Sequence, residues 1–419
     1  MREMKDSGNK WIGLIPKTWG VERIKTIFSE RSELSEDGSE TLLSVSEYYG
    51  VANRAEKVED GEYVSRAESL VGYKKCYKGD LVSNIMLAWK GSMGVTELDG
   101  IVSPAYCVYK PSKSVYPRYY HYLFRTSLYT SIFRLYSKGI IDSRLRLYSP
   151  YFFDIKAIIP SFAEQQRIAE FLDIKCAEVD EMIGLQEQII EELKAYKQSV
   201  ITEAVTKGLN PNAPKRDSGI EWIGQIPEHW ELCRVKNIIF EVHSITDTGE
   251  GEKLSVTQNR GIIKTSEIEV ANPSLSTIGW KNVEINDIVF NKYKAHSGVF
   301  FVSPYNGIVT FNYSVYRCKG GNIPKFYEHI FKTEGCIGEF RKQMRGVGES
   351  ISPLYTKDLF SINLYTLSIS EQQAIADYLD EKCVDIDSLI QTKQSKIDSL
   401  KEYKKSIIYE YVTGKREVE

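Results

Sequence analysis

The chain repeats itself once, and this repeat limits the folds it can adopt more than any other feature. Residues 6–19 recur at 217–230, where the same Asp-Ser-Gly, Trp-Ile-Gly, Ile-Pro and Trp pattern returns at an offset of 211. Residues 161–206 recur at 368–413 at an offset of 207, and 22 of these 46 residues are identical. The 419 residues are therefore one unit used twice. Two copies are too few for a solenoid, so we expect a pseudo-two-fold assembly.

Each copy begins with a module that mixes strands, tight turns and helices. Short β-branched and aromatic runs, such as residues 105–109, lie between Gly and Asp turns. Asp-Gly at 99–100 and Asn-Gly at 306–307 each precede a β-branched run, and we predict a hairpin turn at both. Residues 116–136 and 325–344 each start beside a proline and are predicted to be helical. We assign the chain to the α+β class, with two similar mixed α/β modules.

Each copy ends with a long helix. Five heptads without a proline favour a coiled coil, and we expect the two helices to pack antiparallel against each other. The alternative is two independent amphipathic helices, each covering its own module. Polar residues interrupt both helices at matching positions and are expected to fix the register: Gln186 with Lys393, and Lys197 with Lys404. The apolar heptad positions are Leu172, Cys176, Val179, Ile183, Ile190, Leu193, Val200 and Ala204, then Leu379, Cys383, Ile386, Ile390, Ile397, Leu400, Ile407 and Tyr411.

These patterns predict four segments. The first module occupies 1–160 and includes the repeated N-terminal segment 1–20, and the first helix occupies 161–207. A linker and the second module follow at 208–367, and the second helix occupies 368–419. Gly208 is expected to end the first helix. The repeated tryptophans either anchor each module to the helices, which we favour, or form a docking surface: Trp11, Trp19, Trp222 and Trp230.

Composition excludes several classes of protein. The chain has 54 Lys+Arg and 57 Asp+Glu, so its net charge of −3 excludes a uniformly basic nucleic-acid binder but allows a local basic groove. Seven cysteines, an odd number without a CxxC pair, indicate reduced thiols in a cytoplasmic protein and no zinc site. No apolar stretch resembles a signal peptide or reaches about 18 residues, so we expect no transmembrane helix.

Motifs that would indicate catalysis are absent from the sequence. There is no GxxxxGK[ST] loop, no GxGxxG after a strand, no HExxH and no GxSxG. Asn-Pro dipeptides at 210–211 and 272–273 lack the second proline and the aromatic residue that amino-methyltransferases place beside a flipped base. The sequence therefore indicates a binding protein, not an enzyme.

Two diverged copies of one module, each followed by a helix, suggest two reading heads. A helix of about 43 residues is roughly 64 Å long at 1.5 Å per residue. This length suits a spacer between two sites on a rod-like ligand such as duplex DNA. The approximate two-fold symmetry also matches the two strand directions of a duplex.

Several segments together resemble the DNA-specificity subunit of type I restriction–modification systems. They are residues 206–230, the Glu-Gln-Gln helix starts at 164–166 and 371–373, residues 412–415, and residues 99–106. The resemblance covers essentially the whole chain. One departure is Thr-Phe-Asn-Tyr at 310–313, where the first module has Ser-Pro-Ala-Tyr.

The resemblance implies a non-catalytic role in host defence. Each of two target-recognition domains would read half of a bipartite DNA site, and the helices would set the gap and dock two methyltransferase subunits. Restriction translocase–nuclease subunits would join for cleavage. S-adenosylmethionine, ATP and Mg would belong to those partners, and this chain would hold no cofactor. The alternative is a coiled-coil scaffold that binds proteins and not DNA, while a standalone nuclease or methyltransferase is disfavoured.

Candidate DNA-contacting residues lie in three loop clusters that differ between the two modules. Arg bonds guanine bidentately and Asn or Gln bonds adenine, whereas Lys and Ser more often hold phosphate. Ordinary surface placement stays open for each, and Trp89 is either a core residue or a wedge. The base-reading candidates are Arg54, Arg144, Arg146, Gln258, Asn259 and Arg260; the phosphate candidates are Lys90, Lys138, Lys292 and Lys294; Ser143, His296 and Ser350 complete the set.

Overall fold

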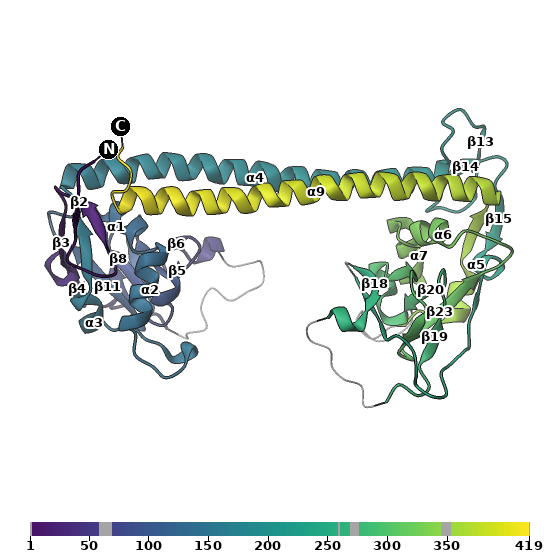
Figure 1. Cartoon of the computed structure of the whole chain (residues 1–419), viewed down its shortest axis with the longest axis horizontal. Coiled ribbons are helices and arrows are strands. Elements are labelled where there is room, and N and C mark those ends of the chain that lie inside the picture. Colours follow the sequence, from purple (N-terminus) through teal and green to yellow (C-terminus); the bar gives the residue numbers. More distant parts are fainter. Residues whose placement is uncertain (1, 58–68, 259, 269–275, 345–352, 419) are drawn as a thin grey trace. The chain divides into compact units, whose positions relative to one another are not determined.

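The computed structural model describes residues 2–57, 69–258, 260–268, 276–344 and 353–418 (Figure 1). The chain divides into two compact units. The first unit combines Met1–Glu187 with Ser395–Glu419, and the second is Gln188–Gln394. Each of the two long helices therefore contributes one part to each unit.

The first unit is built around a four-stranded antiparallel sheet with the order β4-β11-β8-β9. Two-stranded pairs β1-β2, β3-β12, β5-β6 and β7-β10 surround it. The strands are β1 (Met4–Asp6), β2 (Leu14–Pro16), β3 (Gly20–Arg23), β4 (Phe28–Arg31), β5 (Leu43–Ser46), β6 (Gly50–Asn53), β7 (Lys74–Cys76), β8 (Leu81–Asn84), β9 (Met93–Val95), β10 (Gly100–Val102), β11 (Tyr106–Pro111) and β12 (Lys156–Ile159). The helices are η1 (Ile24–Thr26), η2 (Ala55–Lys57), η3 (Ala88–Lys90), α1 (Pro117–Leu123), α2 (Ser127–Tyr136), η4 (Asp142–Arg144) and α3 (Ser149–Asp154).

The second unit repeats this plan with the sheet β16-β23-β20-β21 and the pairs β13-β14, β15-β24, β17-β18 and β19-β22. The strands are β13 (Lys215–Asp217), β14 (Gln225–Pro227), β15 (Glu231–Arg234), β16 (Ile239–Glu241), β17 (Leu254–Thr257), β18 (Gly261–Lys264), β19 (Lys281–Val283), β20 (Ile288–Asn291), β21 (Phe300–Val302), β22 (Gly307–Val309), β23 (Tyr313–Cys318) and β24 (Asn363–Thr366). The helices are α5 (Val235–Ile238), η5 (Thr265–Glu267), η6 (Lys292–Ser297), α6 (Pro324–Phe331), α7 (Glu334–Gln343) and α8 (Thr356–Ser361).

Aromatic side chains form much of both cores. In the first unit, Phe124 lies against Phe133 and Phe152, with ring centroids 5.8 Å apart in each pair. In the second unit, Phe300 stacks on Phe290 and Phe340 at 4.1 and 4.9 Å. Large rings remove much apolar surface from water, so they stabilise modules whose strands are only three to six residues long.

The stretches predicted to be helical at 116–136 and 325–344 each contain two helices, separated by a short break that was not predicted. α1 ends at Leu123, and the side chain of Thr126 caps α2 by accepting the amide of Tyr129. Thr333 caps α7 in the same way through the amide of Cys336. A threonine N-cap has extended backbone, which interrupts a helix even where the apolar pattern continues.

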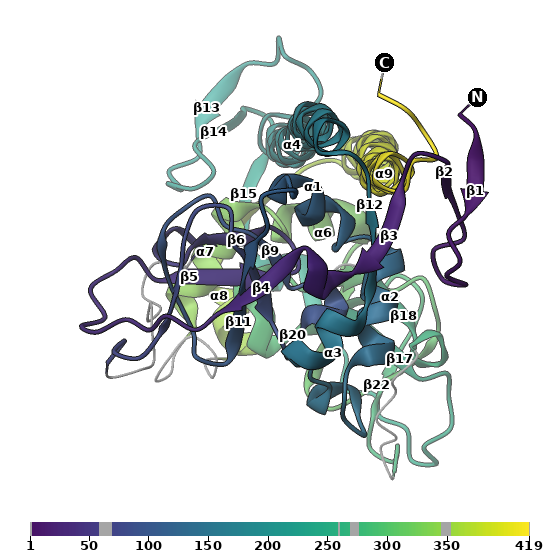
Figure 2. The same ribbon diagram turned by 90° about the vertical axis from the view of Figure 1, so that its left-hand side faces the viewer.

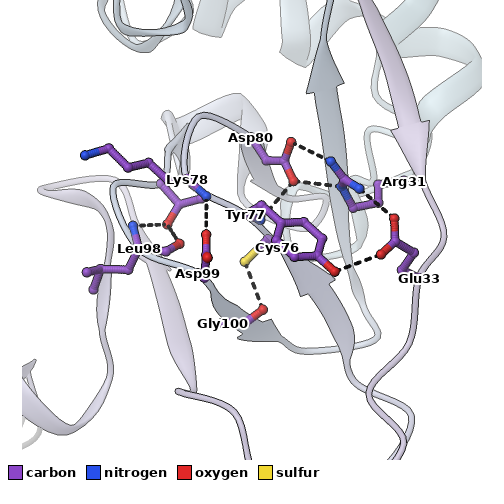
Figure 3. Close-up of polar contacts among 10 residues, drawn as sticks. Arg31, Glu33, Cys76, Tyr77, Lys78, Asp80, Leu98, Asp99 and Gly100 are labelled. Atoms are coloured by element: carbon purple, nitrogen blue, oxygen red, sulfur yellow. Dashed lines mark hydrogen bonds and ion pairs between the residues drawn. The ribbon is translucent and has the colours of Figure 1, made fainter.

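The predicted hairpin turns at 99–100 and 306–307 are also wrong. β9 pairs with β8, and β10 pairs with β7. The Asp99 carboxylate accepts the amide of Lys78 at 2.7 Å (Figure 3). A Cβ at Gly100 would lie 2.4 Å from the carbonyl oxygen of Thr41, and one at Gly307 would lie 2.4 Å from that of Glu252. These glycines allow two backbone segments to approach closely and do not close a hairpin.

The long helices α4 (Phe162–Lys207) and α9 (Ile369–Val412) pack together antiparallel (Figure 1), which confirms the predicted fold class. Figure 2 shows them side by side, viewed nearly along their axes. In the first unit the ring of Phe171 lies 4.5 Å from that of Tyr411. Every residue at a predicted apolar heptad position is buried or half-buried, as the coiled-coil interpretation requires.

Of the matched polar heptad positions, Lys197 and Lys404 form two equivalent ion pairs. Lys404 binds both oxygens of Asp180 in the first unit, and Lys197 binds both oxygens of Asp387 in the second. Each bond is 2.6 to 2.8 Å long. The residues of one pair correspond to those of the other at an offset of 207, so each unit forms the same ion pair from equivalent residues.

Two of the four repeated tryptophans anchor a module to a helix end. Trp19 is buried and contacts the turn at Gly414, and buried Trp230 lies against Gly208 and stacks on Tyr365 at 4.8 Å. Gly208 ends α4 as predicted, with φ of 72° and its amide bonded to Ala204. Trp222 packs on α7, whereas Trp11 is 57% exposed. No helix among the described residues is long and apolar enough to cross a membrane.

Candidate nucleic-acid interface

Two loops of the first unit meet beside the central sheet and carry most of its predicted contact residues. One contains η3, and the other runs from Lys138 through η4 to Arg146. The amide of Leu147 donates to the carbonyl of Ile85 at 2.9 Å and holds the two loops together. Gly139 has φ of 152° and lies against the backbone of Arg144, where a Cβ would be 2.5 Å from a carbonyl oxygen. A larger residue at Gly139 would open the loop.

A pocket of about 550 Å³ lies between these loops. Its floor includes Trp89, which is half-buried against the core and donates its indole N–H to the carbonyl of Met86. Trp89 therefore packs on the core with one part and lines the pocket with another. The lining residues are Met86, Leu87, Trp89, Lys90, Asp142, Ser143 and Arg146.

Cations at this pocket differ in whether a carboxylate neutralises them. Arg134 of α2 stacks over Trp89 and binds both oxygens of Asp142, at 2.8 and 3.0 Å. Arg146 donates to the carbonyls of Ser143 and Leu145. Four cations of the loops have no ion-pair partner within the described part of the chain: Lys90, Lys138, Arg144 and Arg146. Unneutralised cations on a surface attract phosphate.

The remaining predicted residue of the first unit, Arg54, lies elsewhere, directly after the β5–β6 hairpin. Its Nε is buried without a hydrogen-bond partner among the described residues. Burial raises the pKa of Tyr106, and the nearby Arg54 guanidinium opposes that rise. The tip of the hairpin carries Tyr48, which is 84% exposed. The sequence thus predicts residues in two elements of this unit, the loops that line the pocket and the hairpin.

The second unit reproduces the junction between loops. The amide of Leu354 donates to the carbonyl of Lys292 at 3.0 Å, which is the counterpart of the bond between Leu147 and Ile85. Lys292, Lys294 and His296 all lie in η6, and Arg341 of α7 donates to the carbonyl of His296. Within the described ranges, neither Lys292 nor Lys294 has an ion-pair partner.

The β17–β18 hairpin carries the other predicted residues of the second unit. Gln258 and Arg260 are exposed in its turn, but Arg260 is paired with Glu267 at 3.2 Å. This pairing leaves Arg260 a weaker candidate for base contact than the sequence suggested. Asn259 and Ser350 lie outside the residues that the structure describes.

Sequence reasoning missed Arg134 and Asp142, which fix the shape and charge of the first unit's pocket. Only the folded geometry reveals this pair, because the two residues are eight positions apart and lie on different elements. No group of three or more His, Cys, Asp or Glu side chains that could hold a metal occurs among the described residues. All seven cysteines are free, and burial raises the pKa of Cys76 to about 12.

Comparison with known proteins relates the chain to specificity subunits of type I restriction enzymes. A putative MjaX specificity subunit of Methanocaldococcus jannaschii is 25% identical over 317 residues, covering 73% of this chain and 70% of that protein. The MjaVIII subunit of the same organism is 25% identical and covers 63% of each protein. The EcoKI subunit of Escherichia coli is 24% identical, covering 71% of this chain and 64% of its own length. The last two matches span less than two thirds of those relatives.

Solved structures share the fold across nearly the whole chain, although no protein-family model matches it. A chain from a structure of a type I restriction–modification system aligns with a TM-score of 0.68 and 15% identity, covering 96% of this chain and 99% of its own. The HsdS subunit from Thermoanaerobacter tengcongensis aligns with a TM-score of 0.55 and 16% identity, covering 98% and 100%. In sequence and in fold, the relatives of this chain are the specificity subunits of type I restriction enzymes.

Proposed function

We propose that this chain is the DNA-recognition subunit of a type I restriction–modification complex, in which each unit reads one half of a bipartite site. Its relatives are named as specificity subunits. The proposal is carried by one observation, which concerns the loop junction that both units share. In each unit, lysines at this junction have no ion-pair partner among the described residues: Lys90 and Lys138 in the first, and Lys292 and Lys294 in the second. Such cations suit phosphate, and the sequence differences around them suit different bases.

The charges of the long helices support this division of roles. Lys194 pairs with Glu191 and Lys175 with Glu178, in addition to the pairs between the helices. The acidic residues of the helices thus offset their own cations. A net charge of −3 is therefore compatible with two local DNA-binding surfaces.

The helices are proposed to dock two methyltransferase subunits, one for each half of the repeat. Exposed apolar side chains recur at equivalent positions: Met182 corresponds to Leu389, and Tyr196 to Tyr403. Two matching apolar surfaces suit two copies of one partner. Restriction subunits would join this complex for cleavage, and S-adenosylmethionine, ATP and Mg would bind to the partners.

Methylation mapping tests the function. The full chain would be produced with a type I methyltransferase subunit in a host without adenine methylation, and methylated adenines would be mapped across the genome. We expect methylation at one bipartite motif only when both proteins are present. Methylation at an uninterrupted motif, or none with a partner that forms a complex, would contradict the proposal. A complex without any DNA specificity would favour the protein-scaffold alternative.

The loop lysines can be tested with duplex DNA. Lys90→Ala and Lys138→Ala should each weaken binding of the full complex about equally for all sequences, and each should reduce the slope of log affinity against log salt by about one. Lys194→Ala is a matched control because Lys194 is neutralised by Glu191 on α4. An equal loss in the control would assign the effect to net charge rather than to the loops.

The spacer role is tested by shortening both helices. Removing one heptad from each helix shortens it by about 10 Å, or about three base pairs of duplex. We expect a gap shorter by about three base pairs and two unchanged half-sites in the methylation map. An unchanged gap in a folded complex would exclude the helices as its determinant.

A further inference from the structure

An arginine at the break between α1 and α2 holds the tip of the β5–β6 hairpin. Arg125 Nη2 donates to the carbonyls of both Glu47 and Tyr48 at 2.8 Å. These carbonyls belong to consecutive residues of the turn that joins the two strands. One side chain from the helical layer thus fixes the backbone of the hairpin tip, while the Tyr48 side chain remains exposed.

Two glycines allow the hairpin to come this close. Gly50 begins β6 with φ of 81°, and a Cβ there would lie 2.5 Å from Arg125 Nη1. A Cβ at Gly94 in β9 would lie 3.0 Å from the Cα of Gly50. Larger residues would push the hairpin away from the helices, so the contact with Arg125 depends on the sequence at both positions.

Arg125 is also a cation for which no carboxylate serves as ion-pair partner among the described residues. Its neighbour His121 is buried and accepts the amide of Val95 on Nδ1 at 3.3 Å. Burial lowers the pKa of His121 well below its usual value, and Arg125 and Arg118 lower it further, so His121 is neutral. Burial likewise lowers the pKa of Arg125 to about 10, which leaves it charged at neutral pH. The two tip carbonyls are the acceptors that offset its partial burial.

The second unit holds its hairpin differently at the equivalent positions. Gly261 begins β18 as Gly50 begins β6, but Phe301 replaces Gly94, and the Phe301 ring lies 3.2 Å from a Cβ built at Gly261. Glu328 replaces His121 and accepts the amide of Val302, and Lys332 replaces Arg125. Lys332 pairs with Glu328 and lies 3.9 Å from the centre of the Phe301 ring. In the second unit, the Phe301 ring therefore packs against the hairpin where the first unit has the hydrogen bonds of Arg125.

We propose that Arg125 is a positioning residue that sets how the β5–β6 hairpin presents Tyr48 and Arg54 to the first half of the DNA site. The inference rests on the proposed function and extends it to a hairpin whose residues do not line the pocket. In the second unit, Phe301 and Lys332 position the β17–β18 hairpin. The two units therefore share an equivalent hairpin but position it through different side-chain contacts, so that each hairpin can change without affecting the other.

The test removes the bonds and keeps the bulk of the side chain. In Arg125→Met, amides of residues 43–53 should exchange with deuterium at least about tenfold faster in the full chain, because the two tip carbonyls lose the guanidinium donor that holds them. Arg125→Lys keeps donors at this site and should restore part of the protection. Lys110→Met is the matched control, since it removes an exposed cation of the same unit outside the contact.

Discrimination by the full methyltransferase complex is measured with duplexes that carry the mapped motif or one altered half-site. Arg125→Met should lower discrimination at the first half-site about tenfold, in line with the loss of one base contact, and leave the second half-site and non-specific binding unchanged. Arg125→Lys should recover part of this loss, which a general loss of affinity would not.

Three results would overturn the inference, and they differ from one another. Unchanged hairpin exchange in Arg125→Met would show that the arginine does not hold the tip. Faster exchange with unchanged discrimination would show that the hairpin position does not set DNA reading. A wild-type complex without any mapped motif would reject the proposed function together with the hairpin's role in it, whereas the exchange result would still decide whether Arg125 holds the tip.

Discussion

The two units each bury a carboxylate at the start of a central strand, but they neutralise it with arginines from different strands. Asp80 and Asp287 occupy equivalent positions at the start of a central strand and are 2% and 1% exposed. Each accepts the backbone amide three residues before it, from Tyr77 and Glu284. The carboxylate of Asp80 binds Arg31 of β4 (Figure 3), whereas that of Asp287 binds Arg317 of β23.

The difference shows what a duplicated fold conserves. A buried carboxylate needs a counter-charge, because leaving it unpaired costs several kcal/mol. Arg317 corresponds to Lys110 of the first unit, and the residue of the second unit that matches Arg31 is Val242. The repeat therefore retains the carboxylate and its turn, while the guanidinium that neutralises it has moved to the neighbouring strand.

The largest predicted effect comes from removing these carboxylates. Asp287→Ala leaves Arg317 half-buried beside a single carboxylate, Glu284, and should lower the free energy of unfolding of the second unit by about 3–5 kcal/mol. Asp80→Ala should do the same to the first unit. Denaturant unfolding of the full chain, with hydrogen exchange to locate the loss, measures both. Equal loss of protection in both units would contradict their independence.

Moving the arginine of the first unit to the strand that carries it in the second unit sharpens the comparison further. Arg31→Val alone should destabilise the first unit, and the added Lys110→Arg should recover part of that loss by supplying the guanidinium from the other strand. Additive effects in this double-mutant cycle would show that the two positions cannot substitute for each other.

Trp222 packs on α7, whereas its counterpart Trp11 is exposed. A Cβ at Gly335 would lie 2.7 Å from the Trp222 ring, and the residue of the first unit that corresponds to Gly335 is Leu128. Gly335→Leu should expel the Trp222 indole and cost about 1–3 kcal/mol. Indole fluorescence should shift to longer wavelength. An unshifted spectrum would show that the glycine is not what admits the ring.

Acidification should destabilise the first unit at a higher pH than the second, because the first unit has His121 at the position that Glu328 occupies in the second. The pKa of buried His121 is lowered, so the unfolded chain binds a proton first, and the first unit should lose about 1.4 kcal/mol per pH unit below about pH 6.5. Burial would raise the pKa of Glu328, but Lys332 and Lys325 lower it, so its contribution is lost only below about pH 4.5. Hydrogen exchange at pH 5.5 and 7.5 should show extra opening in the first unit only, and His121→Gln should remove the difference.

The smallest effect is expected at the helix pair. Lys197 and Lys404 pair with carboxylates that are about 60% exposed, so Lys197→Ala or Lys404→Ala should each cost about 0.2–1 kcal/mol and should do so equally. Thermal unfolding of the two variants measures this. A clear difference between them would show that the pseudo-symmetry of the pairs does not extend to their energetics.

The sequence predicted the periodic parts of the fold better than the irregular ones. Heptads identify α4 and α9 because each side chain's burial follows its position along the helix. The helix break at Thr126 was missed because a threonine N-cap competes locally with an unbroken apolar pattern. Glycine at 100 serves a close backbone contact with residue 41, which the sequence alone does not reveal.

The candidate site residues were likewise predicted where the sequence repeats and missed where their roles depend on contacts between distant elements. The pocket collects Lys90, Ser143 and Arg146, which were predicted because both loops recur at fixed offsets in the repeat. Arg125 and Arg134 escaped prediction because their roles depend on carbonyls and a carboxylate from other elements. Whether any of these residues contacts DNA stays a prediction.

The central claim, that each unit reads its own half of a DNA site, is tested most directly by methylation maps of two matched variants. One complex would carry Arg144→Ala with Arg146→Ala, two base-reading candidates of the first unit, and the other Gln258→Ala with Asn259→Ala, two base-reading candidates of the second. The account predicts that the first variant loses sequence preference at one half of the motif and the second at the other half. Loss at the same half in both maps, or at both halves in each, would contradict it.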